Sequence, residues 1–301
     1  MITRTLCFSS PGRLSVRDQQ LVYDAKDGAH HTFPIEDLGF VIIESDQILL
    51  TIPCLRHLSA ANVAVIVCDA THMPTAQFLP YAGHTNSQEI IAAQLAASDA
   101  VQGRLWRQIV RQKILNQADL MDRLEAPGSA RLRTLAADVK NHDPTNCEAQ
   151  AARIYFQALM PEGVTRERDG EWPNMPLNYG YGILRAAVAR ALVGSGLLCV
   201  RGIHHHNRYN PFCLADDMME PYRPFVDQYI LGRVRPFDVP LKEITQPMRA
   251  RLLEMLTCDV AMGSMRRPLM VALSSTTASL ARAYKGETST LSLPAFNTLN
   301  K

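Results

Sequence analysis

Residues 87–124 read SQEIIAAQLAASDAVQGRLWRQIVRQKILNQADLMDRL. Apolar residues recur in this stretch every three or four positions, which is typical of amphipathic helices. Later segments, from CEAQAARIYFQALM to RRPLMVALSSTTASLARAYKG, have the same character, and no internal repeat is evident. We therefore predict a larger all-α helical domain over residues 89–301.

The first 75 residues follow a different pattern. Short segments rich in β-branched and aromatic residues alternate with turn-type residues, at positions 4–10, 13–25, 30–35, 39–45, 47–52 and 63–69. One short helix is expected within residues 50–62. Because each sheet must bury one face, we predict a small β-sandwich domain over residues 1–75, in an α+β multidomain chain. Residues 76–88 lie in a proline-containing stretch with few periodic apolar positions and are the expected linker.

Composition sets outer limits on the class of protein. The 301 residues are 47% apolar, which is enough for a full core, and the net charge of +2 neither proves nor excludes a nucleic-acid partner. Seven scattered cysteines form no C-x-x-C pair, which favours free thiols in a reducing compartment. No signal peptide or membrane span is visible, so we expect a soluble, cytoplasmic protein.

Glu148 follows a helix-start pattern, HDPTNCE, at residues 142–148. A carboxylate in the first turn is favoured by the helix dipole, and that structural reading is sufficient on its own. Its small neighbours Ala149, Ala151 and Ala152 would also let a ligand approach closely. The residue is therefore a candidate for either role.

The stretch GIHHHNRYNPFCLADDMMEPYRP, residues 202–224, is rich in ligand-type side chains. Asp217 and Glu220 are three apart, which places both on one face of a helix, although Asp216 or Asp217 could equally cap a helix. Pro221 and Pro224 predict an irregular helix here. One imidazole nitrogen with carboxylate oxygens suits Mg²⁺ or Mn²⁺ better than Zn²⁺, whereas an exposed polar loop is the simpler alternative.

Basic residues form a stripe in QGRLWRQIVRQKILNQ, residues 102–117. Arg104, Arg107 and Arg111 recur at helical spacing, and Lys113 adds to the charge. Such a stripe can track phosphates, but a solvated helix face has the same pattern. Arg223 lies beside the proposed metal region, where positive charge suits a phosphodiester substrate. The sequence contains neither a Walker loop, nor a dinucleotide fingerprint, nor a G-x-S-x-G nucleophile motif.

Taken in order, Glu148, NYGYGILRA, GIHHH and DDMMEPYRP resemble the integrase subunit of CRISPR spacer acquisition, the Cas-one family, most closely its type II version. TFPIEDLGFVIIES and VCDATHMP in the N-terminal part agree, so the resemblance covers essentially the whole chain.

The resemblance implies an N-terminal β domain for dimerisation and a helical catalytic domain. Two homodimers would flank a dimer of the small second acquisition subunit, the Cas-two family, in a heterohexamer, with the type II effector nuclease as a further partner. Glu148, His205 and Glu220 match the family's metal ligands, and Asp217 matches an assisting catalytic residue. The match between the histidines and the family motif is uncertain by one position, so His204 is the alternative to His205 as the ligand.

The implied reaction is a metal-dependent transesterification. It joins the 3′-OH ends of a short double-stranded DNA to a CRISPR repeat, and Mg²⁺ or Mn²⁺ activates the hydroxyl and stabilises the leaving oxygen. Arg104, Arg107, Arg111 and Arg223 are the candidate DNA contacts. The alternatives are a plain metal-dependent nuclease and a non-catalytic DNA-binding scaffold.

Overall fold

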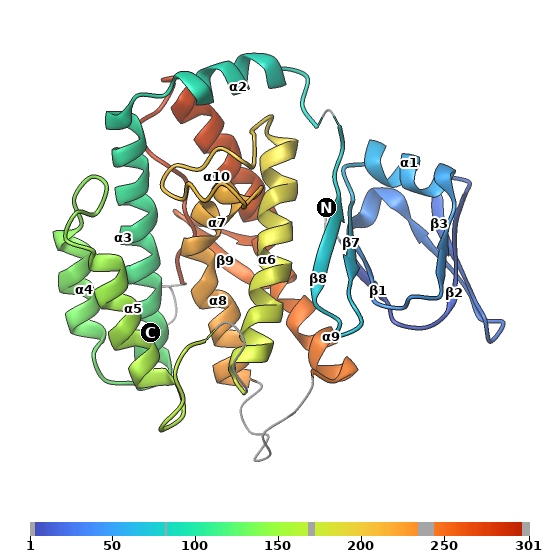
Figure 1. Cartoon of the computed structure of the whole chain (residues 1–301), viewed down its shortest axis with the longest axis horizontal. Coiled ribbons are helices and arrows are strands. Elements are labelled where there is room, and N and C mark those ends of the chain that lie inside the picture. The colour runs from blue at the N-terminus through green and yellow to red at the C-terminus, as the bar shows by residue number, and fades with distance from the viewer. Residues whose placement is uncertain (1–3, 82, 168–171, 234–243, 297–301) are drawn as a thin grey trace. The chain divides into compact units, whose positions relative to one another are not determined.

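Short strands make up most of the first part of the chain, and long helices most of the rest (Figure 1). The computed structural model describes residues 4–81, 83–167, 172–233 and 244–296. These fall into two compact units, Met1–Thr85 and Asn86–Lys301. An N-terminal β region followed by a helical region is thus confirmed.

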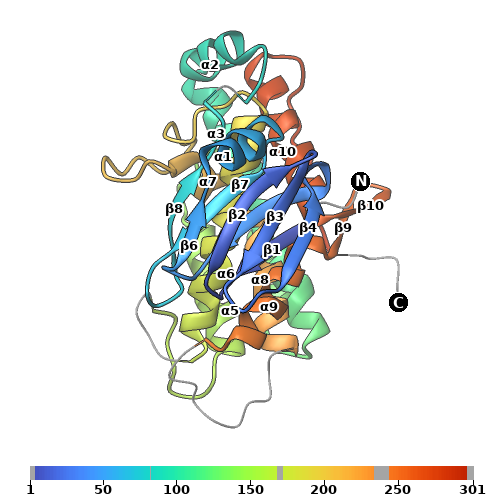
Figure 2. The ribbon, with the colours of Figure 1, turned by 90° about the vertical axis from the view of Figure 1, so that its right-hand side faces the viewer.

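The N-terminal unit contains two four-stranded sheets, whose strands are the blue ribbons of Figure 2. The first has the order β1-β5-β7-β8 and the second the order β4-β3-β2-β6. The strands are β1 (Arg4–Phe8), β2 (Gly12–Arg17), β3 (Gln20–Ala25), β4 (His30–Pro34), β5 (Leu38–Ile43), β6 (Ile48–Leu50), β7 (Ala64–Cys68) and β8 (Pro74–Phe78). Both sheets mix parallel and antiparallel pairs, and both are small, so a β-sandwich in the expected sense is not confirmed.

An apolar core joins the two sheets of this unit. It joins Leu14 and Leu21 of the second sheet to Val41 and Val65 of the first, with Leu58 from the short helix α1 (Ile52–Ala60). That helix lies where the sequence predicts it. It begins after Thr51, whose hydroxyl accepts from the backbone N–H of Cys54.

The expected connection between the domains is partly structured. Strand β8 overlaps its first three residues and pairs antiparallel with β7, and the first compact unit continues to Thr85. Pro74 is tolerated because it is the first residue of an edge strand, where a missing N–H removes no ladder bond.

The helical unit is built around α3 (Asp99–Arg123), and α4 (Ser129–Asp138) and α5 (Cys147–Leu159) lie beside it, on its left in Figure 1. The buried stripe of α3 includes Trp106, Ile109, Val110, Lys113 and Ile114, at helical spacing. The remaining helices are α2 (Ser87–Ala96), α6 (Asn174–Gly194), α7 (Cys213–Met219), α8 (Arg223–Asp227), α9 (Gln246–Glu254) and α10 (Leu269–Tyr284).

The sequence predicts that this unit is all-α. That prediction is wrong, because two short strands interrupt the helices. Strands β9 (Asp259–Met262) and β10 (Met265–Pro268) pair antiparallel around a turn at Gly263, whose φ of 62° favours glycine. The helical spacing of the neighbouring segments conceals this hairpin. Among the described residues, no helix combines the length and apolarity needed to cross a membrane.

Candidate active site

Glu148 lies in the first turn of α5, where the helix-start pattern places it. Asp143 takes up the first backbone N–H groups: its Oδ1 accepts from Cys147 and its Oδ2 from Glu148, each at 2.9 Å. The side-chain oxygen of Asn146 accepts from the next backbone N–H, that of Ala149. The Glu148 carboxylate faces α3, where Lys113 Nζ lies 2.5 Å from Oε1. Asp143 and Asn146 thus make the capping bonds, while Glu148 stands in the first turn, where the helix dipole favours a carboxylate, and also pairs with Lys113.

Glu220 lies where α7 gives way to a single 3₁₀ turn, Glu220–Tyr222 (η2). The irregularity predicted from the prolines is present, since Pro221 has no N–H to continue an α-helix. The Glu220 side chain is only 6% exposed; its Oε2 forms an ion pair with Lys113, and Arg223 Nη1 donates to Oε1 at 2.9 Å. Burial alone would raise the pKa of Glu220, but Arg223 and Lys113 outweigh it and hold the pKa at about 2.

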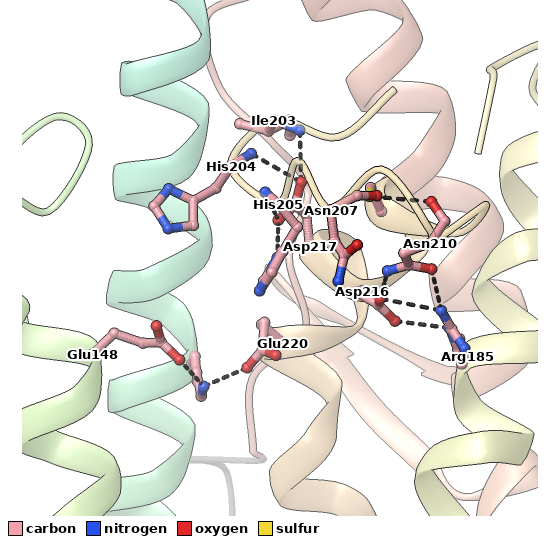
Figure 3. Close-up of polar contacts among 12 residues, drawn as sticks. Glu148, Arg185, Ile203, His204, His205, Asn207, Asn210, Asp216, Asp217 and Glu220 are labelled. Carbon is pink, nitrogen blue, oxygen red and sulfur yellow. Dashed lines mark hydrogen bonds and ion pairs between the residues drawn. The ribbon is translucent and has the colours of Figure 1, made fainter. Parts of the chain in front are cut away.

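Two carboxylates from different elements thus converge on one ammonium group. Figure 3 shows Glu148 and Glu220 pointing toward each other from α5 and η2. Lys113 lies between them, with its side chain 6% exposed. Lys113 therefore does not belong with the exposed arginines of the basic stripe, because position 113 is one of the buried positions of α3.

Asp217 organises the histidine loop, residues 203–212. Its side chain is fully buried, and Oδ2 accepts from the backbone N–H of Ile203 at 2.6 Å and of His204 at 3.0 Å. Oδ1 accepts from the backbone of His205 at 3.2 Å and lies 2.6 Å from that residue's Nδ1. Gly202 permits this approach, since a Cβ there would lie 2.9 Å from Asp217 Oδ2 and would collide with the carbonyl oxygen of His205.

The adjacent histidines have different surroundings. The His204 ring stacks on Trp106 with centroids 4.3 Å apart and planes within 4°. The His205 ring points from the loop toward Glu220 in Figure 3. Its hydrogen bond to Asp217 raises its pKa against the effect of burial, whereas burial lowers the pKa of His204. Because the carboxylate fixes Nδ1, the Nε2 nitrogen of His205 is left for a ligand.

A second set of polar contacts fixes the C-terminal part of the histidine loop. Arg185 of α6 pairs with Asp216 at 2.8 Å, and Asn210 donates to the same carboxylate at 2.5 Å. Neither Asp216 nor Asp217 caps a helix, because α7 begins at Cys213 and both lie inside it. The capping alternative is therefore wrong for both residues.

The donor set fits a hard divalent cation in part. Glu148 and Glu220 offer carboxylate oxygens to one cation position, and His205 is oriented nearby. Within residues 4–81, 83–167, 172–233 and 244–296, however, no three His, Cys, Asp or Glu side chains are grouped closely enough to hold a metal ion. The three-ligand site of Glu148, His205 and Glu220 stays a prediction.

The predicted DNA contacts separate into two kinds. Arg104, Arg107 and Arg111 are exposed on α3, which fits both a phosphate-tracking stripe and a solvated face. Arg223 instead forms part of the site: its side chain is 28% exposed, binds Glu220 and lies with Cζ 4.2 Å from the centroid of the Tyr181 ring.

A cavity of about 900 Å³ extends from Lys113 and Glu148 over α5, α6 and α8. Its charged lining includes Arg153, Arg166 and Asp227. Asp227 accepts from the hydroxyl groups of Tyr155, at 2.7 Å, and Tyr181, and burial raises its pKa. The sequence gives one signal for this cluster: Tyr155 follows Glu148 by seven residues within α5, and a seven-residue step returns to the same side of a helix.

Comparison with known proteins decides the family. The model of the family described as CRISPR associated protein Cas1 matches residues 6–246. The chain belongs to the Cas1 family. The resemblance seen in its motifs is thereby confirmed.

Individual Cas1 relatives agree over most of the chain. A CRISPR-associated endonuclease Cas1 of Neisseria meningitidis is 40% identical over 267 residues, which are 87% of this chain and 85% of that protein. A CRISPR-associated endonuclease Cas1 of Pyrobaculum aerophilum is 26% identical over 255 residues, 80% of this chain and 85% of that protein.

Solved structures share the fold at lower identity. A casposase bound to integration product has a TM-score of 0.78 at 18% identity and covers 100% of this chain and 94% of its own. A Cas1 protein from Thermotoga maritima has a TM-score of 0.74 at 17% identity, covering 95% and 98%. Both likenesses concern the fold alone.

Proposed function

We propose that this Cas1-family chain is a metal-dependent DNA endonuclease and integrase that inserts short DNA into a CRISPR repeat array, as part of antiviral defence. The observation that carries the proposal is the convergence of Glu148 and Glu220 on one cation position, beside a histidine that Asp217 holds in place. The name endonuclease borne by the Neisseria relative supports this choice.

The reaction is an exchange of phosphodiester bonds. The 3′-hydroxyl of the incoming DNA attacks a phosphorus of the repeat, a new P–O bond forms, and the old one breaks with the proton passing to the leaving 3′-oxygen. Because the number of phosphodiester bonds is conserved, no nucleotide triphosphate is consumed. With water as the nucleophile the same site would hydrolyse DNA.

Glu148, Glu220 and His205 Nε2 would hold Mg²⁺ or Mn²⁺, which when bound supplies charge stabilisation at the phosphate oxygens and lowers the pKa of the attacking hydroxyl. Asp217 accepts from Nδ1–H of His205 and so keeps the lone pair of Nε2 facing the site. Arg223, fixed by Glu220 and Tyr181, contributes positive charge beside the phosphate.

DNA would bind mainly through its backbone, with Arg104, Arg107 and Arg111 as phosphate contacts. We propose a homodimer that assembles with a small Cas2-type subunit in the cytoplasm. Two solved complexes named Cas6-RT-Cas1–Cas2 share the fold, with TM-scores of 0.74 and 0.64, each at 20% identity. The type II effector nuclease would be a further partner.

The test supplies a labelled 3′-OH duplex, a repeat-bearing plasmid and the Cas2-type subunit. Metal-dependent covalent joining supports the integrase, and cleavage without joining supports the plain nuclease. DNA binding by folded wild type with neither joining nor cleavage supports the DNA-binding scaffold. If Glu148→Gln and Glu220→Gln keep full activity while folded, the acidic cluster is structural and the proposed site is wrong.

A further inference from the structure

Lys113 holds its ammonium between the two carboxylates of the site, where it balances their negative charge. Its side chain and that of Glu220 are each 6% exposed, and its Nζ is within ion-pair distance of both Glu148 and Glu220. Two carboxylates brought together at such a site repel each other unless a cation lies between them. Without a metal ion, Lys113 is the group that meets this requirement for both.

The second cation of the cluster is held differently. Arg223 binds the other oxygen of Glu220 and stacks on Tyr181, with Cζ 4.2 Å from the ring centroid. Its planar guanidinium is thus fixed from two directions. Lys113 has a compact ammonium on a flexible four-carbon stem, so of these two cations it is the one that can leave without dismantling the site.

We propose that the Lys113 ammonium is the resident cation of the site, and that a divalent ion displaces it from between Glu148 and Glu220. This rests on the proposed function, because it assumes that these carboxylates bind the metal. The cavity of about 900 Å³ is lined by Lys113 itself and gives the displaced ammonium somewhere to go. Metal binding is then an exchange of one cation for another.

The exchange has a measurable consequence. In the metal-free protein Lys113 stabilises the carboxylates, and in the metal-bound protein the divalent ion has taken over that role. Wild-type affinity for the metal is therefore weaker than the same carboxylates would show without the lysine. Removing the ammonium should destabilise the metal-free state and tighten metal binding together, which a purely structural lysine would not do.

The experiment measures Mn²⁺ binding to the full chain without DNA, by the paramagnetic resonance signal of free Mn²⁺, and the Tm in EDTA and in saturating Mn²⁺. Lys113→Met should lower the Kd for Mn²⁺ by about ten-fold or more. Its Tm should be below wild type in EDTA, and Mn²⁺ should raise it by more than it raises the wild-type Tm. Lys113→Gln, which keeps a donor without the charge, should behave alike and replaces Lys113→Met if that variant does not fold.

Lys285→Met is the matched control. Lys285 also bridges two carboxylates, Glu89 at 3.1 Å and Glu287 at 2.8 Å, but belongs to a separate cluster. Its loss should leave the Mn²⁺ affinity unchanged, while Lys113→Arg, which keeps a competing charge, should show no gain.

The outcomes separate this inference from the proposed function. If wild type binds Mn²⁺, Glu148→Gln abolishes binding and both neutral Lys113 variants bind no more tightly than wild type, Lys113 does not compete and only the inference fails. If no variant with Glu148 and Glu220 intact binds Mn²⁺, both fail. Measurable Mn²⁺ binding in wild type that becomes about ten-fold tighter or more when Lys113 is neutralised, and is unchanged in Lys285→Met, supports the inference.

Discussion

Asp217 holds His205 by its backbone and its ring at once: Oδ1 accepts from the backbone N–H at 3.2 Å and lies 2.6 Å from Nδ1. A buried carboxylate on α7 therefore sets both the position of the residue and the direction of its free nitrogen. The same carboxylate binds the N–H groups of Ile203 and His204, so the loop and the ring are fixed as one unit.

The first prediction concerns which histidine serves the site. His205→Ala should lower the rate of DNA joining by about 100-fold or more, because it removes the nitrogen that Asp217 orients. His206→Ala is the matched control, since His206 is an exposed neighbour on the same loop. Joining rates and Tm are compared in the two variants. A greater loss of joining activity in His206→Ala than in His205→Ala would show that His205 is not the histidine that serves the site.

The second prediction tests the close approach at Gly202. A Cβ there would collide with the carbonyl oxygen of His205 and crowd Asp217 Oδ2. Gly202→Ala should therefore destabilise the fold by about 1–3 kcal/mol and reduce joining, because the loop must shift away from Asp217. Urea denaturation gives the first quantity and the joining assay the second. An alanine variant with wild-type stability and activity would show that the loop does not need this contact.

The third prediction concerns the exposed arginines of α3. Reversing Arg104, Arg107 and Arg111 to Glu should weaken duplex binding and reduce the slope of log K against log salt by roughly one for each phosphate that the protein no longer binds. Arg131→Glu, an exposed arginine on α4, is the control for charge alone. Equal salt slopes in all of these proteins would mean that the stripe is a solvated face.

The fourth prediction follows from the low pKa of Glu220, which falls from an ordinary 4.5 to about 2. A carboxyl with a depressed pKa stabilises the fold at pH values above its unfolded pKa and loses that contribution as the pH falls toward its folded pKa. In EDTA, wild-type Tm should drop between pH 4.5 and 2, and part of that drop should be missing in Glu220→Gln. Glu254→Gln, an exposed carboxyl, should keep the full drop. Identical profiles for wild type and Glu220→Gln would contradict the pairing with Lys113 and Arg223.

The division into a β region and a helical region was predictable from the sequence, because hydrophobic period distinguishes GFVIIES from RQIVRQKILNQ. Strand β8 was not, since a proline at the start of an edge strand reads as a turn. The β9–β10 hairpin was missed because it is only four residues on each side.

The candidate site shows the same limits. Residue type and spacing made Glu148, Asp217 and Glu220 candidates, and the family resemblance gave them site roles, but their partners depend on contacts between distant elements. Lys113 lies 35 positions before Glu148, and its burial follows only from the apolar stripe of α3. Asp217 looked like a helix cap because the start of α7 at Cys213 carries no capping side chain that would have marked it.

The most direct test of the central claim is the joining reaction itself. A labelled 3′-OH duplex, a repeat-bearing plasmid, the Cas2-type subunit and Mn²⁺ are incubated with wild type and with Glu148→Gln. We expect wild type to produce a covalent DNA product that EDTA abolishes, and Glu148→Gln to produce none while retaining its fold and duplex binding. A folded Glu148→Gln protein that joins DNA at the wild-type rate would contradict the account.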